Sequence, residues 1–217
     1  MAIDWGIVEL AIPLLLHGLL TTLRICLLAI VLGSALGFAL GLAAFSRLAP
    51  VRWAVRAYVD FVRGTPLLIQ IFLVYFALPG LGINLSEFWA GVTALALNAG
   101  GFIAEIVRAG INSIERGQAE AARSIGMTGN QILIHILLPQ ALRPIVPPLT
   151  NELVNLIKGS ALLSVISVYE LTRAGQAIIS THFVPFEIYF LIALYYYVVI
   201  SAVASLSRYL ERRLPVW

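Results

Sequence analysis

The amino-acid sequence predicts an all-α integral membrane protein with about five transmembrane helices, an outside N-terminus and an inside C-terminus. Of its 217 residues, 60% are hydrophobic and 12% are charged, and the mean hydropathy is +0.95. Soluble domains carry about 25% charged residues, so this chain has too few charges to cover itself with a water-facing surface. Runs of roughly 20 apolar residues cross a bilayer, and the chain has room for about five.

The first apolar segment, residues 10–45, is longer than one straight span needs. As one helix it would extend roughly 50 Å, whereas the hydrocarbon core is ~30 Å thick. We therefore expect a short interfacial piece over residues 9–18, partly broken by Pro13, and then a span over residues 19–45. In that span, small residues that suit close helix contact in lipid recur at four-residue spacing: Gly33, Ser34, Gly37 and Gly41.

The next segment has the pattern of an amphipathic helix. Four charged residues share one helical face: Arg52, Arg56, Asp60 and Arg63. Apolar and aromatic residues occupy the opposite face. We expect this helix to lie at the membrane interface and to continue into a second span, residues 65–78, which Pro79 and Gly80 end.

Three further spans follow in the hydropathy pattern, over residues 88–111, 145–168 and 188–206. The chain enters the fourth span through four prolines: Pro139, Pro144, Pro147 and Pro148. Between the fourth and the last span we expect a loop that contains Glu170, Arg173, Pro185 and Glu187.

The arginines determine the predicted orientation. One set of connections holds most of them: Arg47, Arg52, Arg56, Arg116, Arg123, Arg143, Arg208, Arg212 and Arg213. The opposite set holds several acids and Arg173 as its single base. The positive-inside rule places the first set in the cytoplasm, so the net charge of +3 does not indicate a nucleic-acid partner. We expect the first hydrophobic segment to be retained, because no basic region or small-residue cleavage site marks a signal peptide.

The sequence argues against a metal or nucleotide site in this chain. Cys26 is the single cysteine, which excludes an intrachain disulfide or a thiolate metal site. The histidines are far apart and none shows ligand spacing: His17, His135 and His182. No Gly-x-x-x-x-Gly-Lys-Ser/Thr run is present. We therefore expect no cofactor in this chain and an energy source on a partner.

The connection between the third and fourth spans is polar and structured. Gly117 and Gly126 bracket an alanine-rich helix over residues 118–125, and Gly126 suits the left-handed position that ends it. Thr128 is placed to cap a second helix, which we expect Pro139 to end. The small side chains of Ala121 and Ala122 would allow close docking of the first helix in a groove. On spacing alone, an ordinary amphipathic interfacial helix fits equally well.

The order of residues in this connection resembles the EAA signature of permease subunits of ABC importers. The resemblance is carried by Glu120-Ala121-Ala122, by Gly126, and by Leu138-Pro139 about a dozen residues later. In that family the loop forms a coupling helix, which sits in a cleft on a cytoplasmic ATPase. The resemblance thus implies that the ATPase-coupling residues are Glu120, Ala121, Ala122, Arg123 and Gly126.

Three other stretches look like one branch of that family, the polar-amino-acid permeases of the histidine, arginine and glutamine type. They are Arg63-Gly64-Thr65-Pro66-Leu67-Leu68-Ile69-Gln70, the run from Phe102 to Ile111, and Lys158-Gly159-Ser160-Ala161-Leu162. The resemblance extends from residue 18 to the C-terminus. It departs from the usual pattern at Phe102, where Tyr is more common, and at residues 159–161, which are smaller than usual.

The resemblance implies a single permease domain over residues 1–217, in the inner (cytoplasmic) membrane of a bacterial cell. The implied partners are a cytoplasmic ABC ATPase dimer that binds ATP and Mg, a second permease chain, identical or related, and an extracytoplasmic amino-acid-binding protein. Transport would occur by alternating access in the permease dimer. No enzymatic activity is expected of this chain itself.

Polar residues inside the spans are candidate substrate contacts, because ionisable groups in the hydrocarbon are costly and mark functional sites. Glu152, Asn155 and Lys158 share one helical stripe, and Asn98, Phe102 and Glu105 share another. Lys158, Ser160 or backbone amides would meet a substrate carboxylate, and Glu105 or Glu152 an ammonium. The predicted set is Thr65, Asn98, Phe102, Glu105, Glu152, Asn155, Lys158 and Ser160. Because this set contains two acids, Glu105 and Glu152, we expect the substrate to be a basic amino acid. Structural pairs, Glu152 with Lys158 and Glu105 with Arg108, are the alternative.

Two other functional classes are less consistent with the sequence. An ion-coupled secondary amino-acid transporter, with Glu105 and Glu152 as a relay, would need inverted repeats with broken helices, and none is detectable. An intramembrane enzyme would need a metal set or a Ser–His pairing at a shared depth, and neither is present.

Overall fold

The computed structural model describes residues 5–211, and this part of the chain is helical with no strand. Four helical segments are long and apolar enough to cross a membrane. They are α1 (Trp5–Ala43), α4 (Glu87–Asn112), the continuous segment Gly129–Ile166, and α9 (Pro185–Glu211). A bent pair of helices raises the number to five if it is counted as one span. The all-α membrane fold class is therefore confirmed, and the orientation remains a prediction.

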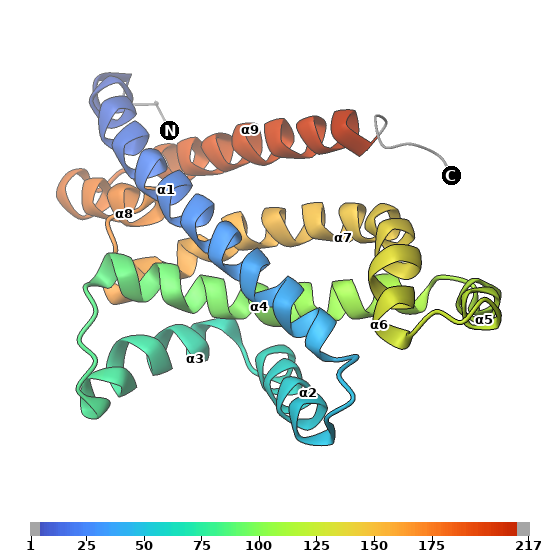
Figure 1. Ribbon diagram of the computed structural model, residues 1–217. Helices are drawn as coiled ribbons and strands as arrows, with labels where there is room; N and C mark the ends of the chain where they lie inside the picture. Colours follow the sequence, from blue (N-terminus) through green and yellow to red (C-terminus); the bar gives the residue numbers. More distant parts are fainter. Residues whose placement is uncertain (1–4, 212–217) are drawn as a thin grey trace.

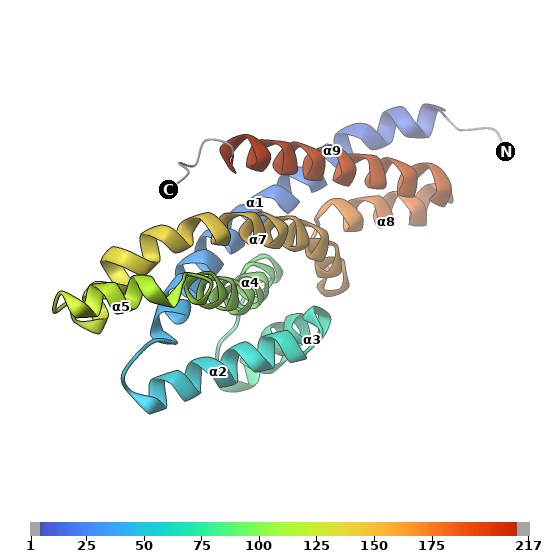
Figure 2. The same ribbon diagram turned by 90° about the vertical axis from the view of Figure 1, so that its right-hand side faces the viewer.

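The helices lie in layers around α4. In Figures 1 and 2, α4 and α7 (Leu138–Gly159) lie between α2–α3 on one side and α8–α9 on the other, while α1 crosses the long axis of α4. Helix α4 contacts α1, α2, α3 and α7. Its buried face is rich in alanine and glycine, which allows these neighbours to approach its backbone closely.

Helix α1 is continuous, and the expected break at Pro13 is wrong. The ring of Pro13 is exposed, while Ala11 and Leu15 on either side of it are fully buried. Packing of these residues against α8 holds the turn in place although one backbone hydrogen bond is missing. The small residues spaced four apart in α1 do lie at a contact with another helix, α4. A Cβ added at Gly37 would lie 2.5 Å from the Cβ of Ile103 on α4.

The amphipathic helix α2 (Ala49–Gly64) buries Val55, Val59 and Val62, but it does not continue into a straight second span as expected. Thr65 is extended, with φ −120° and ψ 144°, because the ring of Pro66 disfavours a helical residue before it. Helix α3 (Leu67–Phe72) therefore starts at a 112° bend. A π-helical turn (Leu73–Ala77) and a 3-10 turn (Leu78–Leu81) complete this segment.

The polar connection forms α5 (Arg116–Ser124) and α6 (Gly129–Gln131). Gly126 has φ +84°, and Thr128 forms a capping box with Gln131, as the sequence predicts. The prediction that Pro139 ends the second helix is wrong. The chain passes through a π-helical turn (Ile132–Leu137) directly into α7. The wider π turn accommodates a proline that an unbroken α-helix would exclude.

The residues after the fourth span form a helix, and the expectation of a loop there is wrong. A 3-10 segment (Ser160–Ile166) leads to α8 (Leu171–His182). Buried Glu170 caps α8, accepting hydrogen bonds from the backbone N–H groups of Thr172 (2.9 Å) and Arg173 (2.7 Å). Burial raises the pKa of the Glu170 carboxyl, and these donors act in the opposite direction. The acidic cap and the spacing of the buried face identify this helix in retrospect: Leu171, Ala174, Gly175 and Ile178.

Candidate functional site

Five of the eight predicted substrate contacts converge on one cavity of about 200 Å³. They come from the bend between α2 and α3, from α4 and from α7: Thr65, Asn98, Phe102, Glu152 and Asn155. Leu67, Leu95 and Leu156 complete the lining. This cavity is a candidate for substrate binding, and for that reason we call it the substrate pocket. Helix periodicity places the α4 and α7 residues on facing stripes, and the bend at Pro66 brings Thr65 between them.

Gln70, which is not among the predicted site residues, holds the bend in place. Its side chain is 5% exposed. Its amide nitrogen donates to the Val62 carbonyl (2.8 Å) and to the Thr65 hydroxyl (3.0 Å), and its amide oxygen accepts from Asn98 (3.0 Å). Gln70 thus connects α2, α3 and α4 behind the pocket wall. A polar residue that faces inward from an apolar helix is the signal that identifies it.

Glu152 supplies the charge of the substrate pocket. It is 7% exposed, and within residues 5–211 no cation lies within ion-pair distance of its carboxylate. The expected alternative, a structural pair with Lys158, is therefore absent from the described structure. A buried carboxylate without a counter-ion is costly. The arrangement is suited to a cation that arrives from outside the chain, with the amides of Asn98 and Asn155 beside it.

The other three predicted contacts lie outside the pocket lining. Lys158 is exposed. Ser160 is fully buried at the start of the 3-10 segment, and its hydroxyl donates to the Ile157 carbonyl (2.7 Å). Glu105 lies about one helical turn beyond Phe102 on α4, where it faces a different cavity.

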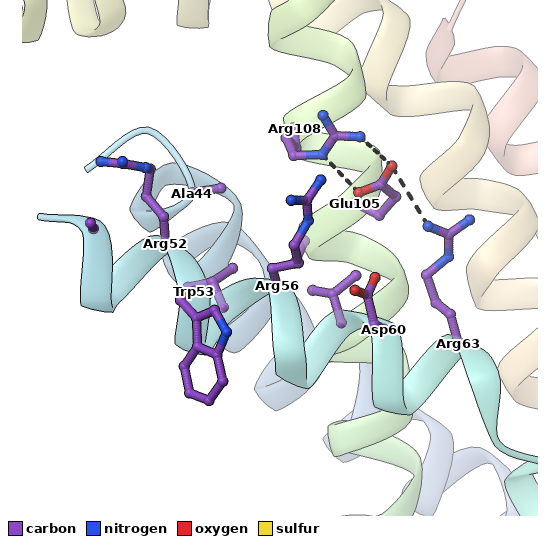
Figure 3. Close-up of a pocket in the computed structure, with 12 residues that line it drawn as sticks. Ala44, Arg52, Trp53, Arg56, Asp60, Arg63, Glu105 and Arg108 are labelled. Atoms are coloured by element: carbon purple, nitrogen blue, oxygen red, sulfur yellow. Dashed lines mark hydrogen bonds and ion pairs between the residues drawn. The ribbon is translucent and has the colours of Figure 1, made fainter. Parts of the chain in front are cut away.

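This second cavity, of about 480 Å³, lies between α2 and α4 (Figure 3). Its polar lining consists of Arg52, Arg56, Asp60, Arg63, Glu105 and Arg108, and we call it the arginine-lined cavity. Arg108 donates two hydrogen bonds to Glu105, at 2.8 Å from Nε and 2.6 Å from a terminal nitrogen. Arg63 approaches the same carboxylate at 3.7 Å. The structural pair between Glu105 and Arg108 is therefore present.

The predicted coupling residues form a helix that projects at one end of the molecule (Figures 1 and 2). Glu120, Ala121 and Arg123 on α5 are exposed, whereas Ala122 is only 5% exposed. Ile125, at the end of the helix, is 78% exposed. The left-handed turn at Gly126 then returns the chain toward α6. An exposed face that combines charge, a small side chain and a large apolar residue is suited to docking on a partner.

Comparison with known proteins identifies relatives over nearly the whole chain. A family model described as "Binding-protein-dependent transport system inner membrane component" matches residues 33–216. The probable glutamine ABC transporter permease protein GlnM of Bacillus subtilis (strain 168) is 39% identical over 199 residues, covering 92% of each chain. The arginine transport system permease protein ArtQ of the same organism is 37% identical over 215 residues, covering 99% of this chain and 98% of that protein.

Solved structures share the same fold. A crystal structure of an amino acid ABC transporter with histidines has a TM-score of 0.92 and 39% identity, covering 99% of this chain and 100% of that chain. An inward-facing MetNI methionine ABC transporter is 22% identical with a TM-score of 0.80, covering 94% of this chain and 97% of that chain. The chain therefore belongs to the family of binding-protein-dependent transport system inner membrane components.

Proposed function

We propose that this ABC importer permease carries polar amino acids, with basic ones favoured, through the substrate pocket. Relatives named for glutamine and for arginine are 39% and 37% identical to it. The observation that carries the proposal is Glu152, a buried carboxylate that lines the pocket and that no cation in the described part of the chain pairs with. An ammonium or guanidinium group would complete this site, and the side-chain amides of Asn98 and Asn155 offer donors to a carboxylate.

ATP hydrolysis is the task of a separate ATPase, because this chain is a transport component. We propose that a cytoplasmic ABC ATPase dimer, which holds ATP and Mg, binds the exposed face of α5. A second permease chain, identical or related, would complete the path, and an extracytoplasmic binding protein would deliver the amino acid. The protein has several membrane-crossing segments. Its proposed location is the bacterial inner membrane, with the arginine-rich side in the cytoplasm.

The alternative of an ion-coupled secondary transporter is not favoured. The relatives are permease proteins of ABC transporters. One of the two acids proposed as a relay, Glu105, is held by two arginines. A carboxylate that already accepts two hydrogen bonds from a guanidinium is a poor site for a transported proton.

The complex itself tests the proposal. The tagged permease is purified in mild detergent from membranes that also contain its ATPase, and its thermal unfolding is followed across a panel of amino acids. We expect a stoichiometric ATPase in the preparation and a higher melting temperature with L-arginine, L-lysine or L-histidine. A preparation without an ATPase, or one that no amino acid stabilises, would contradict the proposed function.

A further inference from the structure

The arginine-lined cavity directly adjoins the substrate pocket along the same two walls. Thr65 lines the pocket and Arg63, two residues earlier, lines the cavity. On α4, Phe102 lines the pocket and Glu105 lines the cavity, which is about 4.5 Å further along the helix axis. A molecule that left the pocket along the groove between α2 and α4 would therefore enter the cavity next.

A shared ion pair at Arg63 and Glu105 stands within three residues of the pocket lining on both helices. Glu105 is held by a bidentate contact from Arg108 on its own helix and by a single longer contact of 3.7 Å from Arg63 on α2. The side chains of Arg63 and Glu105 are 47% and 26% exposed. A long, partly solvated contact is weak, so Arg63 is the partner that a passing cation displaces at least cost. Arg108 keeps Glu105 in place during the exchange.

The cavity also offers a guanidinium that has no ion-pair partner among the side chains that the structure describes. Arg56 extends into the groove from α2 (Figure 3). Among residues 5–209, no carboxylate lies within ion-pair distance of it. Arg52, by contrast, donates to the backbone carbonyls of Ser46 (2.9 Å) and Arg47 (3.0 Å). Arg56 is therefore available to an anionic group such as a carboxylate.

We propose that the arginine-lined cavity is a second, inward-side binding site for the transported amino acid. Arg56 meets the carboxylate of the amino acid, and Glu105 meets its positive groups as Arg63 moves aside. The inference rests on the proposed function, because it requires an amino acid in the substrate pocket. It adds a selectivity step after that pocket. Glu105 lets a cationic side chain pass Arg63 and Arg108, in a cavity whose polar lining holds four arginines and two acids, Asp60 and Glu105.

The decisive variant is Glu105→Gln, measured in proteoliposomes that contain the complete importer with its ATPase and binding protein. L-arginine and L-glutamine are the probes. Without the Glu105 carboxylate, Arg63 and Arg108 repel a cationic side chain but not a neutral one. We expect uptake of arginine to fall about tenfold relative to uptake of glutamine. Glu87→Gln, an exposed acid in the first turn of the same helix, is the control and should leave both rates unchanged.

Arg56→Gln provides an independent readout. Because both probes share the carboxylate, we expect uptake of both to fall by a similar factor. In both variants, stabilisation of the complex by arginine should persist, since the Glu152 pocket is intact. If uptake of arginine and glutamine fell equally in Glu105→Gln, or if neither fell, the inference would be overturned. Unchanged uptake of both probes in Arg56→Gln would also overturn it. Loss of a bound anionic lipid in that variant would then identify the lipid headgroup as the ligand of Arg56. Failure of the proposed function would appear separately, as a wild-type complex that no amino acid stabilises.

Discussion

At the residue scale, the two intramembrane acids have different surroundings, which their sequence positions do not reveal. Glu105 and Glu152 both lie on polar stripes of apolar helices, and the sequence analysis gave both the same role. In the structure Glu105 has two arginine partners, whereas no cation in the described chain pairs with Glu152. Helix periodicity predicts which face a residue occupies. It does not predict how far along that face a cavity extends, so Glu105 fell one turn outside the pocket.

Glu152→Gln should separate substrate binding from folding. The change keeps the shape of the side chain and removes the charge that a basic amino acid would pair with. We expect the affinity for L-arginine to fall roughly 30-fold, about 2 kcal/mol. The stability of the empty complex should be unchanged or slightly higher, because a desolvated carboxylate is gone. Titration of the melting temperature with arginine measures both, with Glu87→Gln as the control. Unaltered arginine affinity would remove Glu152 from the site.

Gln70→Leu tests the support of the pocket wall. The substitution leaves the Val62 carbonyl and the Asn98 amide without their partner, and Thr65 loses its fixed position. We expect a loss of stability of about 1–3 kcal/mol together with weaker substrate binding. Gln176→Leu on α8 is the matched control, at a half-buried site away from the pocket. Equal effects of the two variants in thermal unfolding would show that the network has no special role.

At the element scale, backbone chemistry explains both the successes and the failures of sequence reasoning. The spacing of Gly33, Gly37 and Gly41 predicts a helix contact without naming the partner, and the structure supplies α4. Proline is harder to interpret. Pro66 breaks the helix because its ring holds the preceding Thr65 in an extended conformation, whereas Pro13 and Pro139 remain inside helices. Whether packing or a π turn can compensate for a proline is decided by neighbours distant in the sequence.

Gly37→Ala should loosen the crossing of α1 and α4. The added methyl group would lie 2.5 Å from the Ile103 Cβ and 2.9 Å from the Gly100 carbonyl oxygen. The two helices would have to move apart, at a cost of about 1–3 kcal/mol. Gly80→Ala is the control, since its added carbon meets nothing within 4 Å. Thermal unfolding in detergent compares the two variants. A Gly37→Ala protein as stable as the control would show that the crossing tolerates the shift.

The two alanines of α5 should respond differently to a bulky replacement. Ala121 is exposed and available to a partner, whereas Ala122 is buried against the permease itself. We expect Ala121→Phe to abolish stimulation of the ATPase by loaded binding protein without a change in the melting temperature of the isolated permease. Ala122→Phe should lower that melting temperature. If Ala121→Phe leaves ATPase stimulation intact, the exposed face of α5 is not the docking surface.

At the scale of the whole molecule, the order of apolar segments and the distribution of arginines predict a membrane protein whose ends lie on opposite sides. The membrane class follows from composition, because a chain with 12% charged residues has too few of them to cover a water-facing surface. The lateral arrangement of the helices does not follow from the sequence. The 112° bend brings Thr65 onto the α4–α7 groove, and α8 packs between α1 and α9. Both depend on contacts between segments far apart in sequence.

The predicted orientation can be tested with two matched serines at opposite ends of the molecule. Ser124 on α5 and Ser180 on α8 are both exposed, and each hydroxyl donates only to a carbonyl of its own helix. Because Cys26 is the single cysteine and is buried, Cys26→Ala provides a background for Ser124→Cys and Ser180→Cys. In intact spheroplasts, a membrane-impermeant maleimide should label position 180 and spare position 124. Inverted vesicles should give the reverse, because the arginine-rich connections face the cytoplasm. Labelling of both positions from one side would refute the orientation and, with it, the assignment of α5 to a cytoplasmic ATPase.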